Sequence, residues 1–135
     1  MVRSDKGSSG VMFTLDTESG FRDVILISAA WGLGEMVVQG KVTPDEFLVF
    51  KKTLGTAENP VISKRIGSKA QKMIYRDSGP GLNRTAIVRT LAKEKERFAL
   101  DEKEIIMLAG WGVLIEQHYS TRAGVWTPMD IEWAR

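Results

Sequence analysis

The sequence predicts an α+β fold made of short, mostly antiparallel strands and one or two amphipathic helices. Two observations predict it. Short runs rich in β-branched and aromatic residues are separated by clusters of Gly, Pro, Asp and Ser, which is typical of strands joined by turns. One long segment, beginning near residue 101, instead repeats its apolar residues at helical spacing. With 135 residues, of which 43% are hydrophobic, we expect residues 1–135 to be a single domain or part of one, long enough to bury roughly two-thirds of its unfolded surface.

The first two strands are predicted to form a hairpin. Apolar and polar residues alternate over residues 11–16, which is the two-residue period of a half-buried strand. Residues 16–20 (DTESG) then carry turn chemistry, because Gly20 can adopt a positive φ and Asp and Ser can bond their own backbone. Residues 23–28 (DVILIS) return as a second strand. Upstream, residues 6–10 (KGSSG) lack the spacing of a P-loop.

A glycine-rich turn ends in an acid at residues 31–35 (WGLGE). Gly32 and Gly34 allow a sharp bend and the close approach of a ligand, so that Glu35 could accept hydroxyl donors or help to hold a cation. An ordinary loop with a solvated glutamate explains the same letters, because GxGE is a common and unspecific string. The spacing alone favours the ordinary loop.

A second set of short strands is expected further along the chain. Thr43 to Glu46 predicts a turn, or a single helical turn with Thr43 as its cap and Pro44 in the first helical position. Strands are predicted at residues 47–50, 61–66 and 69–76, with tight turns between them. Residues 77–81 (DSGPG) are predicted to form a loop, and residues 85–90 a short strand.

Basic residues dominate residues 51–76. This segment is open to two interpretations: a positive wall facing a triphosphate or a partner domain, or the solvated face of an edge sheet whose lysines discourage aggregation. Tyr75 is the only aromatic residue among the basic residues of this segment, so binding of single-stranded nucleic acid is disfavoured. The cations are Lys51, Lys52, Lys64, Arg65, Lys69, Lys72 and Arg76, opposed by Glu58 alone.

The strongest helix signal begins at Asp101. Asp101 and Glu104 form a D-x-x-E variant of the capping box, with Leu100 and Ile105 as a hydrophobic staple. Apolar residues then recur at helical spacing as far as residue 115. Gly110 and Gly112 each cost about 1 kcal/mol relative to alanine inside a helix; they either allow a close backbone approach or simply weaken the element. A short charged helical turn is also expected at residues 92–98.

The last strand is predicted to carry two acids on one face. In residues 128–134 (PMDIEWA), Asp130 and Glu132 are two residues apart and therefore point the same way on a strand. Like charges on one face are unfavourable unless a cation or donors compensate them. Magnesium is such a cation and prefers carboxylate and phosphate oxygens. The alternative is a solvent-facing polar edge of a half-buried strand.

Composition excludes several classes of function. A net charge of +2 is too small to argue for nucleic acid. The chain has no cysteine, which excludes disulfides and cysteine–zinc sites. No apolar run approaches the roughly 18 residues of a membrane span, and no signal peptide is visible. These features lead us to expect a soluble cytoplasmic protein without a membrane partner.

Three stretches together resemble a known family: MVRSDKGSSGVMFTLDTESGF, WGLGEMVVQG followed by TPDEF, and PMDIEWA. They resemble the nucleotide-binding region of the family that includes phosphoenolpyruvate synthase, pyruvate, phosphate dikinase and rifampin phosphotransferase. The resemblance is broken at residues 120–127, where a longer surface loop is expected. It implies that the chain is part of an ATP-grasp domain within a much larger enzyme.

The resemblance also implies roles for particular residues, with ATP and Mg2+ as the cofactors. Glu132 matches the metal-binding glutamate, and Asp130 matches the neighbouring acid of the nucleotide site. Glu35 matches the acid of the glycine-rich turn, while Arg3 and Gln39 are further candidate nucleotide contacts. His118 is the only histidine; its neighbours do not match the family's phosphohistidine motif, so we expect it to complement the dipole at the end of a helix.

The implied activity belongs to the parent enzyme, which converts pyruvate, ATP and water to phosphoenolpyruvate, AMP and phosphate through a phosphohistidine. The phosphate-binding lysine, the histidine carrier and the pyruvate-binding domain of that family have no counterpart here. The fragment alone is therefore expected to be inactive. Two alternatives are a related dikinase or phosphotransferase with another acceptor, and a non-catalytic nucleotide-binding or interaction module.

Overall fold

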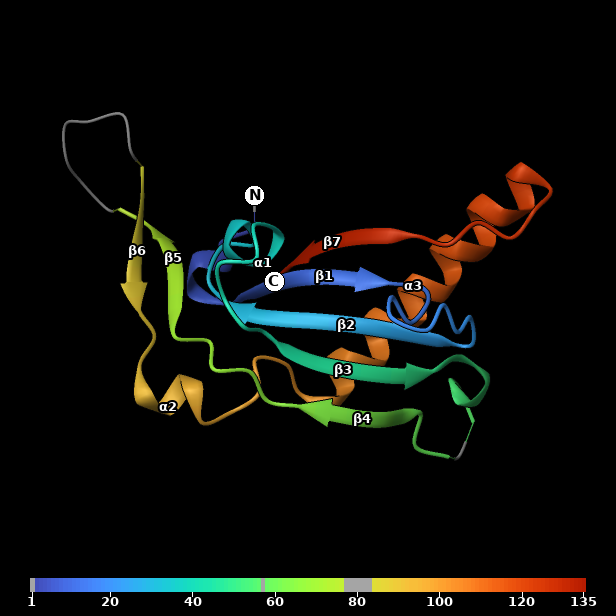
Figure 1. Ribbon diagram of the computed structural model, residues 1–135, viewed down its shortest axis with the longest axis horizontal. Coiled ribbons are helices and arrows are strands. Elements are labelled where there is room, and N and C mark those ends of the chain that lie inside the picture. The colour runs from blue at the N-terminus through green and yellow to red at the C-terminus, as the bar shows by residue number, and fades with distance from the viewer. Residues whose placement is uncertain (1, 57, 77–83) are drawn as a thin grey trace.

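The computed structural model describes residues 2–56, 58–76 and 84–135. A five-stranded antiparallel sheet in the order β4-β3-β2-β1-β7 forms the centre, and a two-stranded ribbon of β5 and β6 stands beside it. One long helix, α3, crosses one face of the sheet (Figure 1). This confirms the α+β prediction. None of the helices in the described part of the chain is long and apolar enough to cross a bilayer.

The hairpin predicted near the N-terminus is confirmed. Strand β1 (Ser8–Phe13) pairs with β2 (Val24–Trp31), with Val11 opposite Ser28. In the turn between them, the Asp16 carboxylate accepts hydrogen bonds from the backbone N–H groups of Glu18 and Ser19, both at 3.3 Å. Gly20 has φ +74°, a conformation that other residues rarely adopt.

The predicted turn at residues 43–46 is wrong, because Asp45 and Glu46 already belong to β3 (Asp45–Phe50). The Asp45 carboxylate is fully buried and accepts the backbone N–H of Gly67 at 2.8 Å and that of Ala99 at 2.7 Å. A buried acid with donors on other segments satisfies its oxygens without a local turn. The turn chemistry of these letters is therefore overridden by tertiary contacts.

The second set of strands is divided between two sheets. β3 pairs with β2 and with β4 (Val61–Arg65), so both extend the first hairpin. Only β5 (Gln71–Tyr75) and β6 (Thr85–Arg89) form a separate ribbon. The predicted loop at residues 77–81 lies outside the described residues. The short helical turn predicted at residues 92–98 is present as α2 (Ala92–Lys95).

Helix α3 (Glu102–Ala123) begins as its capping box predicts. The Asp101 carboxylate accepts the Glu104 N–H at 2.9 Å, and the Glu104 carboxylate accepts the Asp101 N–H at 2.8 Å. The helix ends at Gly124 with φ +68°. The longer loop expected at residues 120–127 is therefore partly wrong, since its first four residues continue the helix. Strand β7 (Asp130–Ala134) follows.

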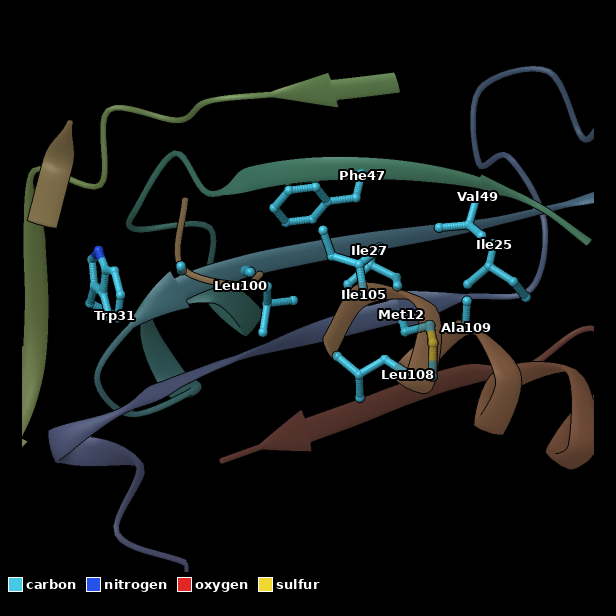
Figure 2. Packing of buried hydrophobic residues seen from close by; sticks show 12 residues of the cluster. Met12, Ile25, Ile27, Trp31, Phe47, Val49, Leu100, Ile105, Leu108 and Ala109 are labelled. Atoms are coloured by element: carbon cyan, nitrogen blue, oxygen red, sulfur yellow. The ribbon is translucent and has the colours of Figure 1, made fainter. Parts of the chain in front are cut away.

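The core lies between α3 and the sheet. Ile105, Leu108 and Ala109 of α3 pack on side chains of β1, β2 and β3 (Figure 2). Burying a side chain of this size contributes roughly 1.5–3 kcal/mol, so this layer dominates the stability of the chain. The sheet residues of the cluster are Met12, Ile25, Ile27, Ala29, Trp31, Phe47 and Val49.

Candidate functional site

The two faces of the sheet differ in what covers them. On β7, Ile131 and Trp133 pack against the core beneath α3, whereas Asp130 and Glu132 are exposed. The alternation places both acids on the face opposite α3. Their neighbours across the β1–β7 ladder are apolar, with Phe13 opposite Asp130 and Val11 opposite Glu132.

The glycine-rich turn brings a third acid to this side of the sheet. Trp31 ends β2, and Glu35 is the first residue of the short helix α1 (Glu35–Val38). Met36 is buried beside Ala30 of β2, which holds the helix against the sheet and leaves Glu35 exposed. The Gln39 amide donates a hydrogen bond to the Glu35 carboxylate at 2.8 Å. Glu35 and Gln39 thus form one pair on the surface of α1.

A pocket of about 490 Å³ lies between α1 and the β1–β7 edge of the sheet. Glu35 enters it from the turn and Glu132 from β7, although they are far apart in the sequence. None of the side chains that line this pocket is basic, so its two carboxylates have no positive partner among the lining residues. The lining residues are Ser9, Gly10, Gly34, Glu35, Val38, Glu132, Trp133 and Ala134.

The other predicted contacts lie outside the pocket lining. Asp130 projects from the same face of β7 two residues before Glu132. Arg3 donates to both carboxylate oxygens of Asp5, at 2.8 and 2.9 Å, and its guanidinium lies 5.7 Å from the centre of the Tyr75 ring. The hydrogen bonds from Arg3 hold the pKa of Asp5 below its ordinary value. The described geometry therefore directs Arg3 to Asp5 and Tyr75.

Ser9 is a residue of the pocket wall that the sequence did not single out. Its hydroxyl donates to the Gly32 carbonyl at 2.6 Å in a buried position, and a side chain on Gly34 would meet it at about 3.5 Å. Ser9 therefore joins β1 to the turn that carries Glu35. The only sequence sign of this role is the Gly- and Ser-rich composition of residues 6–10. These residues do not form a P-loop and instead lead into β1.

The basic segment of residues 51–76 is largely neutralised by nearby acids. Lys51 pairs with Glu116, Lys64 with Glu102 and Lys72 with Glu94. These contacts favour a segment whose cations are paired with acids of this chain over a positive wall that faces phosphate. The remaining pairs are Lys52–Asp23, Arg65–Glu46 and Lys69–Asp45.

His118 lies on α3, on the opposite side of the sheet from the acids. It is exposed, and its ring stacks edge-on against Tyr119 at 5.3 Å between centroids. The helix continues to Ala123, so His118 is more than one turn away from the C-terminus at which we expected it. Its place on α3 separates it from the pocket that holds Glu35 and Glu132.

Among the described residues, the pocket offers a divalent cation two carboxylates, those of Glu35 and Glu132. Within the described residues, no three His, Cys, Asp or Glu side chains come together as a metal-binding group. The two carboxylates of the pocket fit magnesium, because Mg2+ takes one or two carboxylates and completes its shell with water and substrate phosphates. The donor set therefore suits a metal that arrives with a phosphorylated ligand.

Comparison with known proteins decides the family. Residues 1–135 match the family described as "Pyruvate phosphate dikinase, AMP/ATP-binding domain". The chain belongs to this family. Proteins named phosphoenolpyruvate synthase from Aquifex aeolicus, Synechocystis sp. and Escherichia coli are 58%, 53% and 46% identical to it over 135 residues. In each comparison all of this chain is matched, but it spans only 15–16% of the relative.

Family membership supports the resemblance on which the residue assignments were based. The AMP/ATP-binding domain family supports ATP as a ligand of this chain. Two of the candidate residues, Glu35 and Glu132, line the same pocket, and Gln39 is hydrogen-bonded to Glu35.

Proposed function

We propose that this chain is part of the Mg-ATP-binding domain of a phosphoenolpyruvate synthase. The observation that carries the proposal is the pocket in which Glu35 and Glu132 meet on the face of the sheet opposite α3. Membership of the AMP/ATP-binding domain family supports ATP as the ligand. The name shared by relatives that are 46–58% identical supports the choice of enzyme.

Each acid has a separate task in this proposal. Glu132 is the magnesium ligand, and Asp130 on the same strand face is the second acid of the nucleotide site. Glu35, oriented by Gln39, accepts hydroxyl donors of the nucleotide. Magnesium held by Glu132 would supply positive charge next to the phosphate oxygens, which is the charge neutralisation that phosphoryl transfer requires. The carboxylates contribute by holding the metal and the nucleotide in one position.

The reaction of the complete enzyme, as the family resemblance implies it, is part of the same proposal. Pyruvate, ATP and water are converted to phosphoenolpyruvate, AMP and phosphate through a phosphohistidine. His118 does not serve as that carrier in this proposal, because it belongs to α3, which covers the face of the sheet opposite the acids. In this proposal the carrier and the pyruvate site lie outside residues 1–135, which span 15–16% of the relatives.

The proposal is tested by titrating residues 1–135 with Mg-ATP and following backbone amides by NMR, which tolerates weak binding. We expect weak binding, with shifts concentrated on α1, β1 and β7, and a dissociation constant about tenfold higher after Glu132→Gln. Removing one of two carboxylate ligands weakens the hold on the metal and, through it, on the phosphates.

Glu96→Gln is the matched control. Glu96 is an exposed acid at the end of α2, outside the pocket lining, so the same loss of charge there should leave the affinity unchanged. Tight binding that is unaffected by Glu132→Gln, or an equal loss in both variants, would contradict the assignment of the metal to Glu132.

A further inference from the structure

The turn that carries Glu35 is held between two strands. From β1 and the residues before it, the Gly7 carbonyl accepts the Gly32 N–H at 3.1 Å, and Ser9 donates to the Gly32 carbonyl. From the ribbon, the Met73 carbonyl of β5 accepts the Leu33 N–H at 2.9 Å. Gly32 and Leu33 thus have their backbone groups fixed by two separate sheets.

β5 approaches this turn as closely as a glycine permits. Gly32 has φ +86°, and a Cβ atom placed there would lie 2.5 Å from the Met73 carbonyl oxygen and 3.1 Å from the Lys72 Cβ. Real Cβ atoms essentially never approach a backbone oxygen so closely. Any side chain at position 32 must therefore push the turn away from β5 or abandon the backbone conformation.

The ribbon also contacts α1 through its side chains. Met73 and Met36 belong to one buried cluster together with Ala30 and Val42, separate from the core beneath α3. Met36 directly follows Glu35. A shift of β5 is therefore transmitted to the first turn of α1 both by the backbone bond and by the packing of these two methionines.

The base of the ribbon is anchored by a buried ion pair. Lys69 and Asp45 are both fully buried, and the Lys69 ammonium contacts the Asp45 carboxylate and the Gly67 carbonyl. The same carboxylate accepts the N–H groups of Gly67, before β5, and Ala99, after β6. Asp45 therefore connects the chain segment that precedes β5 to the segment that follows β6. Lys72 adds a bond to Glu94 of α2 at 2.6 Å.

We propose that β5 is a positioning strand for the nucleotide pocket: its contact with Gly32 and Leu33 sets the place of Glu35, and nucleotide affinity depends on that contact. The inference rests on the proposed function, since it needs Glu35 to bind the nucleotide. It adds residues of the ribbon, Met73 above all, that do not line the pocket themselves.

A double-mutant cycle with Gly32→Ala and Glu35→Gln tests this. Mg-ATP affinity of residues 1–135 is measured by NMR titration for the unmodified chain, each single variant and the pair. We expect Glu35→Gln and Gly32→Ala each to raise the dissociation constant about tenfold. Once Glu35 has been replaced, Gly32→Ala should change the dissociation constant by less than about twofold. The effects of two substitutions are not additive when one residue acts through the other.

Gly55→Ala is the control for backbone strain. Gly55 has φ +82°, close to that of Gly32, but a Cβ atom there meets nothing within 4 Å. The Gly55→Ala variant should lose stability, because alanine is strained at a positive φ, but it should keep its nucleotide affinity. Should Gly32→Ala not fold, Met73→Ala replaces it in the same cycle, since it removes the packing against Met36 and leaves the Gly32 backbone unstrained.

The outcomes separate the inference from the function on which it rests. If Glu35→Gln has no effect on affinity, the proposed role of Glu35 is wrong. If Glu35→Gln weakens binding but Gly32→Ala does not, or if Gly32→Ala weakens it equally in both backgrounds, β5 does not act through Glu35 and the inference is overturned. An equal loss of affinity in Gly55→Ala overturns it as well.

Discussion

Lys51 and Glu116 form an ion pair that is largely withdrawn from solvent, with 12% and 9% of their side chains exposed. The ammonium donates to both carboxylate oxygens at 2.8 Å and to the Thr14 carbonyl at 2.7 Å. The indole N–H of Trp126 donates to the same carboxylate at 3.0 Å. One pair therefore links the sheet, α3 and the segment that leads to β7.

We expect Lys51→Met to lower the free energy of unfolding by about 3–5 kcal/mol, because it leaves the Glu116 charge buried without its cation. Urea denaturation followed by circular dichroism measures the loss. Lys52→Met is the control: Lys52 is 66% exposed and pairs with Asp23 at the surface, where such a pair contributes about 0–1 kcal/mol. Equal losses in the two variants would show that the buried pair has no special weight.

Asp5 makes the stability of the chain depend on pH. Hydrogen bonds from Arg3 lower its pKa, as the hydrogen bonds from Ser19 lower that of Asp16. A carboxyl group whose pKa is lower in the folded than in the unfolded state stabilises the fold above its unfolded pKa of about 3.9. That stabilisation is lost as the pH falls through the lower, folded pKa.

For Asp5 this predicts a carboxyl pKa below the ordinary value, measurable by carbon NMR of the side chain, that returns toward that value in Arg3→Met. The same substitution should flatten the fall in stability at pH below about 4. Asp16 is the internal reference, since its lowered pKa depends on Ser19 and should not respond. A pKa of Asp5 that is the same with and without Arg3 would contradict the assignment of the shift to the guanidinium.

The sequence could place two of the candidate acids on one strand face, but it could not predict that Glu132 and Glu35 line one pocket. Asp130 and Glu132 were placed on one face by the strand period alone, which is a local property. The meeting of Glu132 with Glu35 depends on the pairing of β7 with β1 and on the packing of Met36, both of which are non-local. Arg3 shows the reverse case. Its partner Asp5 is only two residues away, and this carboxylate competes with the nucleotide contact predicted for Arg3.

The two glycines of α3 have different environments, which the sequence left open. A Cβ atom on Gly110 meets nothing within 4 Å, whereas one on Gly112 lies 3.0 Å from Met12 Sδ and 3.5 Å from Ile25 Cδ1. Gly112 thus permits the close approach of α3 to β1 and β2, and Gly110 only weakens the helix. The core layer beneath α3 depends on one of them.

We expect Gly110→Ala to raise the free energy of unfolding by about 1 kcal/mol, the difference in helix propensity. Gly112→Ala has the same propensity gain but must displace Met12, so it should be neutral or destabilising by about 1–3 kcal/mol. Urea denaturation of the two variants makes the comparison, each serving as the control for the other. A similar gain in both would mean that the flexible Met12 side chain moves aside without cost.

Strands and the helix were predictable where their signal is local. The hairpin of β1 and β2 and the capping box of α3 follow from periodicity and turn chemistry. The turn prediction for residues 43–46 is wrong because the Asp45 carboxylate accepts hydrogen bonds from the backbone N–H groups of Gly67 and Ala99. No local sequence pattern reveals these partners. The sequence could not predict how the later strands divide between the sheet and the ribbon, for the same reason: tertiary contacts decide which strands pair.

The five-stranded sheet carries a different layer on each face. α3 and the main core cover the first face, and α1 packs on the second, with α3 behind the sheet and α1 in front of it in the view of Figure 1. The exposed acids of β7 and Glu35 of α1 lie on the side of α1. Phosphoryl transfer depends almost entirely on positioning and charge neutralisation around the transferred group. The pocket lining has two carboxylates and no basic side chain, so it would supply only part of what the proposed phosphoryl transfer needs.

We therefore expect residues 1–135 to bind Mg-ATP without turning it over. Incubation with ATP, Mg2+ and pyruvate, followed by phosphorus NMR, should show no AMP or phosphoenolpyruvate above a protein-free control. Removing Mg2+ with a chelator should weaken ATP binding, because the carboxylates then face the phosphates without a cation and like charges repel. Formation of AMP that depends on the protein and is lost in Glu132→Gln would contradict this expectation. It would mean that the pocket between α1 and β7 suffices for phosphoryl transfer, without the lysine and histidine that the rest of the enzyme is proposed to supply.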